Sequence, residues 1–204
     1  MGRKPHRASA AEMPAIPPDA SPALRQFVAL LLRWNASVNL IGRGEQQQVW
    51  QRHVADSLQL GRIGTLPERA IDLGSGAGFP GLVLAIEYGI HVDLIEQDQR
   101  KAAFLREAAR VTGAPVTVHA MDIARVKLPP APLVTARALA PVVKLLEFAQ
   151  PLLTPDGACL FLKGRGMEEE LAEADTRWRM QVERIASTTD SDGVILRISG
   201  IAPR

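Results

Sequence analysis

Residues 71–82 constrain the fold of this chain more than any other segment. They read Ile-Asp-Leu-Gly-Ser-Gly-Ala-Gly-Phe-Pro-Gly-Leu, which predicts an apolar strand, a glycine-rich turn and the start of a helix in direct succession. Glycine adopts positive φ angles and places no Cβ atom between the backbone and a ligand, and a helix start offers free N–H groups. The segment therefore predicts an α/β fold that holds a nucleotide-like cofactor against Gly74, Gly76 and Gly78, with the N–H groups of the helix directed toward it.

The neighbours of these glycines favour S-adenosylmethionine over a dinucleotide. The spacing of Gly76, Gly78 and Gly81 also fits the G-x-G-x-x-G pattern of dinucleotide-binding folds. Pro80, however, removes an N–H donor that a pyrophosphate would use, and the carboxylate of Asp72 would repel phosphate charges. S-adenosylmethionine carries an ammonium and a sulfonium group and no phosphate, so an acidic group beside the turn favours this cofactor.

Glu96 is a second candidate for cofactor binding. It closes the apolar run 91–96, about 20 residues beyond the glycine turn, where a carboxylate can accept hydrogen bonds from two ribose hydroxyls. Both S-adenosylmethionine and a dinucleotide contain that ribose. Glu96 therefore supports a cofactor site without deciding between the two.

The composition agrees with one α/β core and a small helical appendage, since 47% of the 204 residues are hydrophobic and 23% are charged. No apolar run approaches the roughly 20 residues of a membrane span, and residues 1–20 lack the apolar stretch of a signal peptide. We therefore expect a cytoplasmic protein with no membrane partner. The one cysteine, Cys159, lies in the apolar run 158–162, which predicts a buried thiol and argues against a disulfide or a metal site.

The N-terminal part predicts a tail and two helices. Several basic residues over 3–7 and four prolines over 14–22 indicate a flexible tail that could touch RNA phosphates. From Ser21, a candidate N-cap, apolar residues recur at helical spacing through Trp34, and a second helix is expected over about 45–60. We divide the chain into a tail over 1–22, an N-terminal helical cap over 23–64 and a cofactor-binding domain over 65–204.

Short apolar runs alternate with helix-forming runs after the glycine turn, as in a doubly wound sheet. Strands are expected near 69–73, 91–96, 116–119, 133–136, 158–163, 181–188 and 193–199. The turn-rich segment 190–193 is too short for a crossover helix, so the last two strands should form an antiparallel hairpin. A seven-stranded, Rossmann-like sheet with this ending is typical of class I S-adenosylmethionine-dependent methyltransferases, whereas dinucleotide dehydrogenases usually continue with parallel strands.

Several short motifs then occur in one order along the chain. They are Trp34-Asn35 with Asn39-Leu40, Arg52-His53 with Asp56-Ser57, Gly76-Ala-Gly-Phe-Pro-Gly81, Arg137-Ala138 and Leu162-Lys163-Gly164. In these motifs, over roughly residues 23–199, the chain resembles the ribosomal RNA small-subunit methyltransferase G family, also called glucose-inhibited division protein B. The resemblance implies methyl transfer from S-adenosylmethionine to N7 of one guanine, guanosine 527 in the 530 loop of 16S ribosomal RNA, with the RNA free or within the small ribosomal subunit.

The resemblance also implies roles for individual residues. Gly74 and Phe79 would line the methionine and sulfonium end of the cofactor, and Arg137 would face the active site. Where the family has an Ala-Glu pair against adenine, this chain has Asp122 and Ile123, and we expect Asp122 to accept the adenine amino hydrogen. The cofactor-binding candidates are Asp72, Gly74, Gly76, Gly78, Phe79, Glu96, Asp122, Ile123 and Arg137.

Arg137 and Lys163 are the candidate catalytic residues. N7 of guanine has an in-plane lone pair, so methyl transfer needs the base to be positioned and needs no general base. A guanidinium or ammonium group suits the N7 and O6 acceptors of guanine or an adjacent phosphate, so we assign both residues to orientation. The alternative is that both cations form surface salt bridges at strand ends. His53 and Asp56 are interpreted as a structural hydrogen-bonded pair, and Asn39 as the cap of a turn.

Two other functions stay open on the sequence alone. A small-molecule methyltransferase would share the glycine turn and Glu96, but its cap should be rich in aromatic residues, which make up 4% of this chain. A nicotinamide-dependent oxidoreductase would share the glycine spacing. We expect a monomeric RNA methyltransferase with S-adenosylmethionine as its cofactor and no metal.

Overall fold

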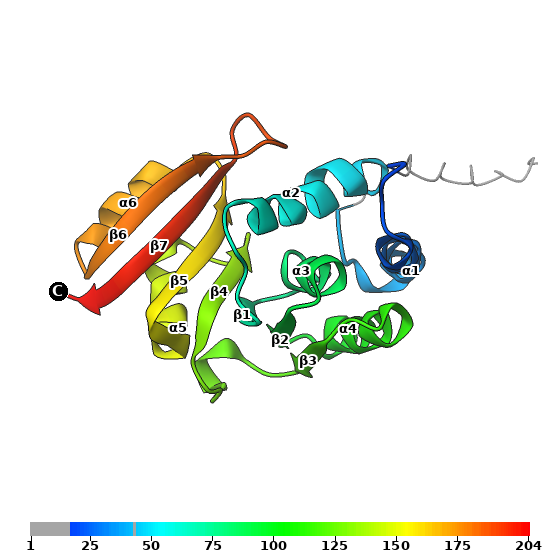
Figure 1. The fold of residues 1–204 in the computed structure, drawn as a ribbon, viewed down its shortest axis with the longest axis horizontal. Helices are drawn as coiled ribbons and strands as arrows, with labels where there is room; N and C mark the ends of the chain where they lie inside the picture. Colours follow the sequence, from blue (N-terminus) through cyan, green and yellow to red (C-terminus); the bar gives the residue numbers. More distant parts are fainter. Residues whose placement is uncertain (1–16, 43) are drawn as a thin grey trace, which may run out of the picture.

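A seven-stranded sheet forms the centre of the computed structural model, which describes residues 17–42 and 44–204 (Figure 1). The strand order is β3-β2-β1-β4-β5-β7-β6. The first five strands in this order pair in parallel, and β7 pairs antiparallel with both β5 and β6. The strands are β1 (Arg69–Leu73), β2 (His91–Ile95), β3 (Val116–His119), β4 (Ala131–Arg137), β5 (Leu153–Lys163), β6 (Trp178–Ala186) and β7 (Val194–Pro203). The predicted sheet and its C-terminal hairpin are therefore confirmed, whereas most of the expected tail, residues 1–16, lies outside the described residues.

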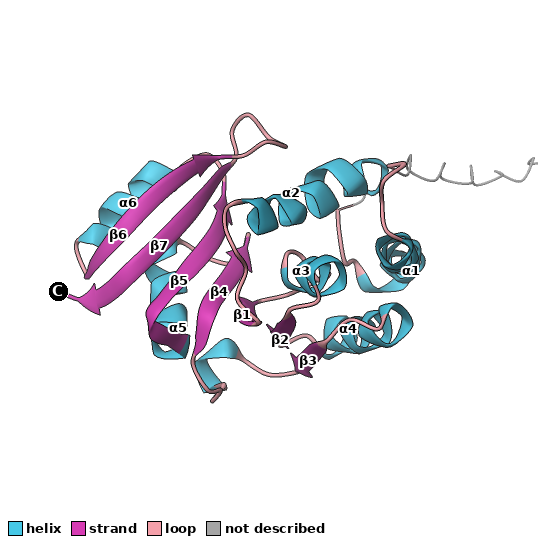
Figure 2. Cartoon of the chain, in the orientation of Figure 1, coloured by secondary structure: helices cyan, strands magenta, loops and turns pink. Residues whose placement is uncertain are grey.

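Helices cover both faces of this sheet (Figure 2). Helices α1, α3 and α4 share a core with one face, and α5 and α6 share a core with the other. Their bounds are α1 (Pro22–Val38), α3 (Gly81–Tyr88), α4 (Gln99–Thr112), α5 (Val142–Ala149) and α6 (Met167–Asp175), with short 3-10 turns at Ile123–Arg125 and Gln150–Leu152. Within the described part of the chain, no helix is both long and apolar enough to cross a membrane.

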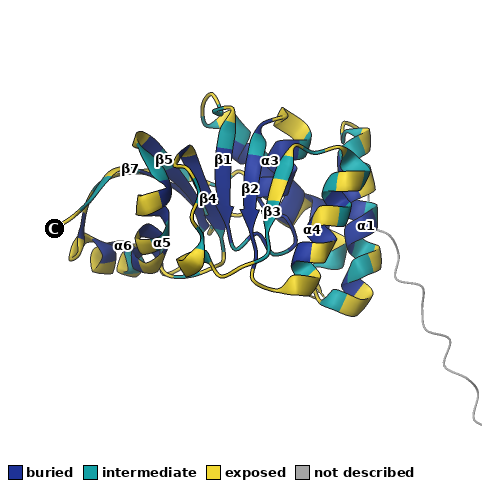
Figure 3. Ribbon diagram, turned by 90° about the horizontal axis from the view of Figure 1, so that it is seen from below, coloured by how far each residue is buried: buried dark blue, intermediate teal, exposed yellow. Residues whose placement is uncertain are grey.

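The central strands are buried on both faces, as Figure 3 shows. Along β1, Ala70 belongs to the core beneath α3, while Ile71 and Leu73 belong to the core beneath α5. This alternation follows from the two-residue repeat of a strand, and a parallel sheet needs apolar residues on both sides because helices cover both. Cys159 lies in the second core, fully buried, where burial raises the pKa of its thiol.

Helix α1 of the cap begins and ends where the sequence predicts. The Ser21 hydroxyl accepts a hydrogen bond from the Leu24 N–H group at 3.3 Å, and Asn39 ends the helix with a left-handed φ of 51°. The ring of Phe27 is fully buried, with its centroid 5.5 Å from that of Phe79 and 6.2 Å from that of Phe104. The cap and the sheet therefore share one core.

The second helix of the cap differs from the prediction of one regular helix over 45–60. The chain instead passes through a 3-10 turn, a π-helix, a short α-helix and another 3-10 turn. These segments are Gln46–Gln48, Val49–Val54, α2 (Ala55–Leu58) and Gln59–Arg62. Apolar spacing alone could not reveal the wider π turn, which includes Arg52 and His53.

Phe27→Ala is expected to lower the free energy of unfolding by about 3–5 kcal/mol, because it would leave a cavity between the cap and the sheet. Urea unfolding followed by circular dichroism and by tryptophan fluorescence would measure this. The two probes should give coincident transitions, since the cap and sheet share a core. If the cap unfolded in a separate transition, it would instead be an independent domain, with its boundary between residues 64 and 65.

Candidate functional site

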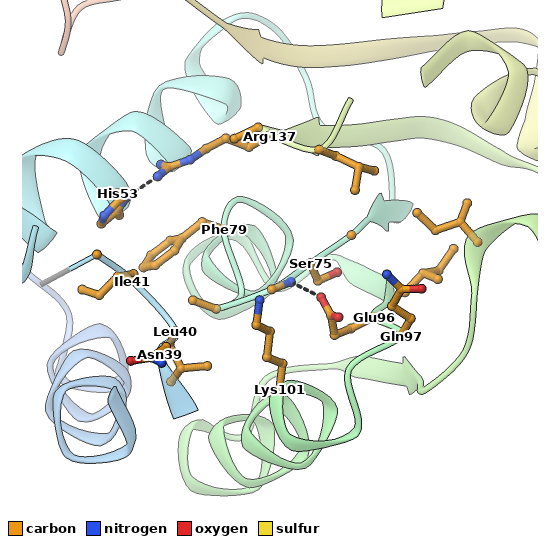
Figure 4. A pocket seen from close by; sticks show the side chains of 18 of the residues that line it. Asn39, Leu40, Ile41, His53, Ser75, Phe79, Glu96, Gln97, Lys101 and Arg137 are labelled. Atoms are coloured by element: carbon orange, nitrogen blue, oxygen red, sulfur yellow. Dashed lines mark hydrogen bonds between the residues drawn. The ribbon is translucent and has the colours of Figure 1, made fainter. Parts of the chain in front are cut away.

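A cavity of about 800 Å³ opens at the carboxyl ends of β1, β2 and β4, where ligands bind in open α/β sheets (Figure 4). We call it the first cavity. Seven of the predicted cofactor-binding residues line it, namely Gly74, Gly76, Phe79, Glu96, Asp122, Ile123 and Arg137. A Cβ atom built on Gly76 would fit without a clash, in ordinary van der Waals contact with the Gly74 carbonyl oxygen at 3.7 Å. The backbone of the glycine turn is therefore accessible to a ligand.

Glu96 holds the glycine turn in place. Its Oε2 accepts a hydrogen bond from the Gly76 N–H group at 2.8 Å, and its Oε1 accepts one from the Asp98 N–H group at 2.8 Å. The residue is 7% exposed and lines the first cavity. Each carboxylate oxygen has two lone pairs, so Glu96 can still accept hydrogen bonds from two ribose hydroxyls while it supports the turn.

Two of the predicted cofactor contacts, Asp72 and Gly78, do not line the first cavity. Asp72 is fully buried, and its Oδ1 accepts a hydrogen bond from the Thr135 hydroxyl at 2.7 Å. A Cβ atom on Gly81 would come within 2.6 Å of the Asp72 Cβ, and one on Gly78 would come within 2.9 Å of Leu82. Asp72 and Gly78 therefore form the packed underside of the turn, and their role toward the cofactor, which for Asp72 includes an interaction through water, stays a prediction.

The expected free N–H groups at the start of α3 are also corrected. The Leu82 and Val83 N–H groups both donate to the Gly78 carbonyl, at 3.0 and 3.4 Å, and the Leu84 N–H group donates to the Pro80 carbonyl at 3.1 Å. These donors are satisfied within the turn itself. The helix start therefore does not offer them to a ligand, and Gly76 and the turn residues beside it form the accessible backbone.

Arg137, at the end of β4, is held by the π-helical segment of the cap. Its Nη1 donates to the Arg52 carbonyl at 3.0 Å and to Asp56 Oδ2 at 3.3 Å, and its Nη2 donates to His53 Nδ1. The guanidinium carbon lies 5.5 Å from the centre of the Phe79 ring. His53 and Asp56 thus both contact Arg137, in place of the pairing with each other that the sequence suggested.

A second cavity of about 330 Å³ meets the first at Arg137. The two share the lining residues Glu45, His53, Arg137 and Ala138. Lys163 lines only the second, and its ammonium group contacts Glu170 at 2.6 Å and the Ala140 carbonyl at 3.1 Å. The side chain of Lys163 is 11% exposed. The structure therefore brings Arg137 to the junction of the cavities and places Lys163, as an ion pair, in the second.

Sequence reasoning missed the loop after α1 and several other lining residues. Asn39, Ile41 and Glu45 reach the first cavity from the cap, and Lys101 reaches it from the first turn of α4 (Figure 4). Asn39 was predicted only as a turn cap, a role it has. No local pattern marks this loop as part of a site, because its place depends on how α1 packs against α4.

The chain matches the model of the family described as rRNA small subunit methyltransferase G over residues 20–194. It is 54% identical to the ribosomal RNA small subunit methyltransferase G of Rhodospirillum centenum, covering 89% of this chain and 84% of the relative. It is 51% identical to that of Gluconobacter oxydans, covering 86% of this chain and 91% of the relative.

Solved structures with low sequence identity share the fold. A putative class I S-adenosylmethionine-dependent methyltransferase from Listeria monocytogenes superposes with a TM-score of 0.63 at 12% identity, covering 86% of this chain and 68% of that one. A ribosomal protein L11 methylase from Lactobacillus delbrueckii superposes with a TM-score of 0.58 at 18% identity, covering 78% of this chain and 80% of that one. At these identities the likeness concerns the fold alone.

Asp72→Asn is expected to change how stability depends on pH. Burial raises the pKa of Asp72 from 3.8 to about 6, against the opposing effect of the Thr135 hydrogen bond. The native state then keeps a proton that the unfolded state releases, so the stability from the protonated carboxyl is present below about pH 4 and is lost as the pH rises through about 6.

Asparagine cannot ionise and would avoid this loss. Between about pH 4.5 and 7.5, the free energy of unfolding of the variant should rise relative to the wild type, by at most about 3 kcal/mol. Urea unfolding of both proteins at both pH values tests this. His53 also contributes to the pH dependence of stability, but its contribution is the same in both proteins and cancels in the difference. A difference that stays constant with pH would contradict the raised pKa.

Proposed function

The chain belongs to the ribosomal RNA small subunit methyltransferase G family, and we propose that it methylates N7 of a guanine in the 530 loop of 16S ribosomal RNA, with S-adenosylmethionine bound in the first cavity. The family match over residues 20–194 carries this proposal, because it includes the cap and both cavities. It replaces the small-molecule methyltransferase and oxidoreductase alternatives. An rRNA substrate also supports a cytoplasmic location, and we retain a monomer as our expectation.

The residues that line the first cavity fit S-adenosylmethionine. The cofactor supplies a methyl group on a positively charged sulfur. Glu96 would bind the ribose hydroxyls, Gly74 and Phe79 would lie beside the methionine and sulfonium end, and Asp122 and Ile123 would contact adenine. One oxygen of Asp122 already accepts the Ala124 N–H hydrogen bond at 2.9 Å, which fixes the direction of this carboxylate.

The contacts around Arg137 support a mechanism based on positioning. Guanine N7 needs no deprotonation before it attacks a methyl group, so the protein must hold the base in line with the reacting carbon. Arg137 lies where the two cavities meet, and its guanidinium suits the O6 acceptor of guanine or a neighbouring phosphate. We propose that the target base enters through the second cavity and that Arg137 orients it. Within the described part of the chain Lys163 makes two contacts, with Glu170 and the Ala140 carbonyl. An ammonium group has three N–H donors, so one is left for RNA.

The function is tested by offering tritiated S-adenosylmethionine and the protein to 16S rRNA and to small subunits that lack the modification. Nucleoside analysis should show labelled N7-methylguanosine, and mapping should place it in the 530 loop. Label in another nucleoside or in another region of the RNA would overturn the proposed acceptor. The comparison of the two substrates also shows whether the enzyme needs an assembled particle.

Arg137→Ala is expected to slow single-turnover methyl transfer by roughly a hundredfold, because loss of orientation by about 1 Å can cost that much. Affinity for S-adenosylhomocysteine, measured by calorimetry, should fall far less. Arg110→Ala is the matched control, since Arg110 pairs with Glu107 on the exposed surface of α4. Full turnover by a folded Arg137→Ala variant would remove Arg137 from the acceptor site.

Glu96→Ala is expected to weaken S-adenosylmethionine binding at least about tenfold, or about 1.4 kcal/mol, because both the ribose acceptor and the support of the glycine turn are lost. Affinity for rRNA should change less. Glu107→Ala, which removes an exposed carboxylate from α4, provides the control for charge. If RNA affinity fell more than cofactor affinity, the cofactor would have been assigned to the wrong cavity.

A further inference from the structure

His53 is a buried histidine at the junction of the two cavities, and the proposed reaction does not use it. The residue is 4% exposed and lines both cavities. Its ring stacks on Phe79, with centroids 5.0 Å apart and planes at 25°. Its Nδ1 accepts a hydrogen bond from Arg137 (Figure 4). Its Nε2 lies 3.4 Å from Glu45 Oε2. His53 thus touches two residues that we place around the reacting groups.

The contacts of Arg137 leave part of its guanidinium free. A guanidinium carries five N–H donors, and the contacts with Arg52, Asp56 and His53 among the described residues use three of them. The remaining two are the Nε hydrogen and one of the two Nη2 hydrogens. Hydrogen-bond donors on two nitrogens of one planar group suit the acceptor atoms of a base or a phosphate.

The π-helix supplies two contacts to Arg137 from adjacent residues, Arg52 and His53. Residues Val49–Val54 form a π-helix, whose backbone is wider than that of an α-helix. Within this segment, the Arg52 carbonyl accepts a hydrogen bond from Arg137. His53, the next residue, presents Nδ1 to the other terminal nitrogen of the same guanidinium. Two adjacent residues therefore fix both Nη atoms.

We propose that His53 is a positioning residue for methyl transfer, whose neutral ring fixes the Arg137 guanidinium so that its two remaining donors face the acceptor. This inference rests on the proposed function of Arg137 and adds a requirement to it. His53 must accept at Nδ1, so Nδ1 must be unprotonated and the ring proton must lie on Nε2, toward Glu45. A structural role for the ring would require only its shape and its stacking on Phe79.

The charges around His53 favour this neutral form. Burial and the nearby Arg137 lower its pKa to about 4, with a smaller contribution from Arg52, while Glu45 acts in the opposite direction. Asp56 contacts the same guanidinium from the other side. At neutral pH the ring is therefore uncharged, and its Nδ1 can accept a hydrogen bond. Arg137 carries only donors, so it needs such an acceptor as its partner.

Two substitutions separate the acceptor from the ring. His53→Phe keeps an aromatic ring against Phe79 and removes the acceptor, whereas His53→Asn removes the ring and can place an oxygen near the position of Nδ1. We expect His53→Phe to lower the single-turnover rate on unmethylated small subunits at least about tenfold, with S-adenosylhomocysteine affinity nearly unchanged. His53→Asn should be at least fivefold faster than His53→Phe. The reverse order would overturn the proposal and show that the ring acts by packing.

A double-mutant cycle keeps the test valid if a variant is less stable. If His53 acts through Arg137, adding His53→Phe to Arg137→Ala should cost little further activity, because the two losses are not additive. Fully additive losses would overturn the proposal. Absence of N7-methylguanosine from wild-type reactions would refute the proposed function itself, whereas an active wild type with an equally active His53→Phe variant would refute only the role of His53.

Discussion

The geometry of the first cavity depends on the Glu96 carboxylate. The register Leu73↔Ile95 brings the ends of β1 and β2 level, and the two strands then continue into different turns. One oxygen of Glu96 holds the glycine turn that follows β1, and the other holds the backbone at Asp98, which caps α4. A single side chain thus links two βα turns that border the first cavity.

Local sequence patterns predicted the elements well. All seven strands, the hairpin and the Ser21 cap follow from apolar alternation, turn residues and capping chemistry. Strand β5 begins at Leu153, earlier than the predicted 158, because a register shift against β4 extends the pairing beyond the apolar run. The π-helix also escaped prediction, since an apolar spacing does not distinguish helical turns of different width.

The predictions for single site residues were less complete for a different reason. The glycine motif identifies which residues make the turn but not which side of it each one faces, and it could not show that Asp72 and Gly78 lie outside the lining of the first cavity. The partner of Lys163 is Glu170, and that contact depends on where α6 packs. The loop 39–42 reaches the first cavity only because α1 packs against α4. These features arise from tertiary packing, which no short motif encodes.

The buried carboxyl of Asp72 has a consequence for binding, although the residue does not line the first cavity. Its Oδ2 has no hydrogen-bond partner among the described residues, and its pKa lies near 6, so its ionisation is sensitive to any charge that arrives nearby. A cation in the adjacent cavity stabilises the ionised form, and by thermodynamic reciprocity the ionised form strengthens the binding of that cation. If S-adenosylmethionine binds in the first cavity as proposed, its positive charge would favour release of the Asp72 proton, and its affinity would then rise with pH in mildly acidic solution.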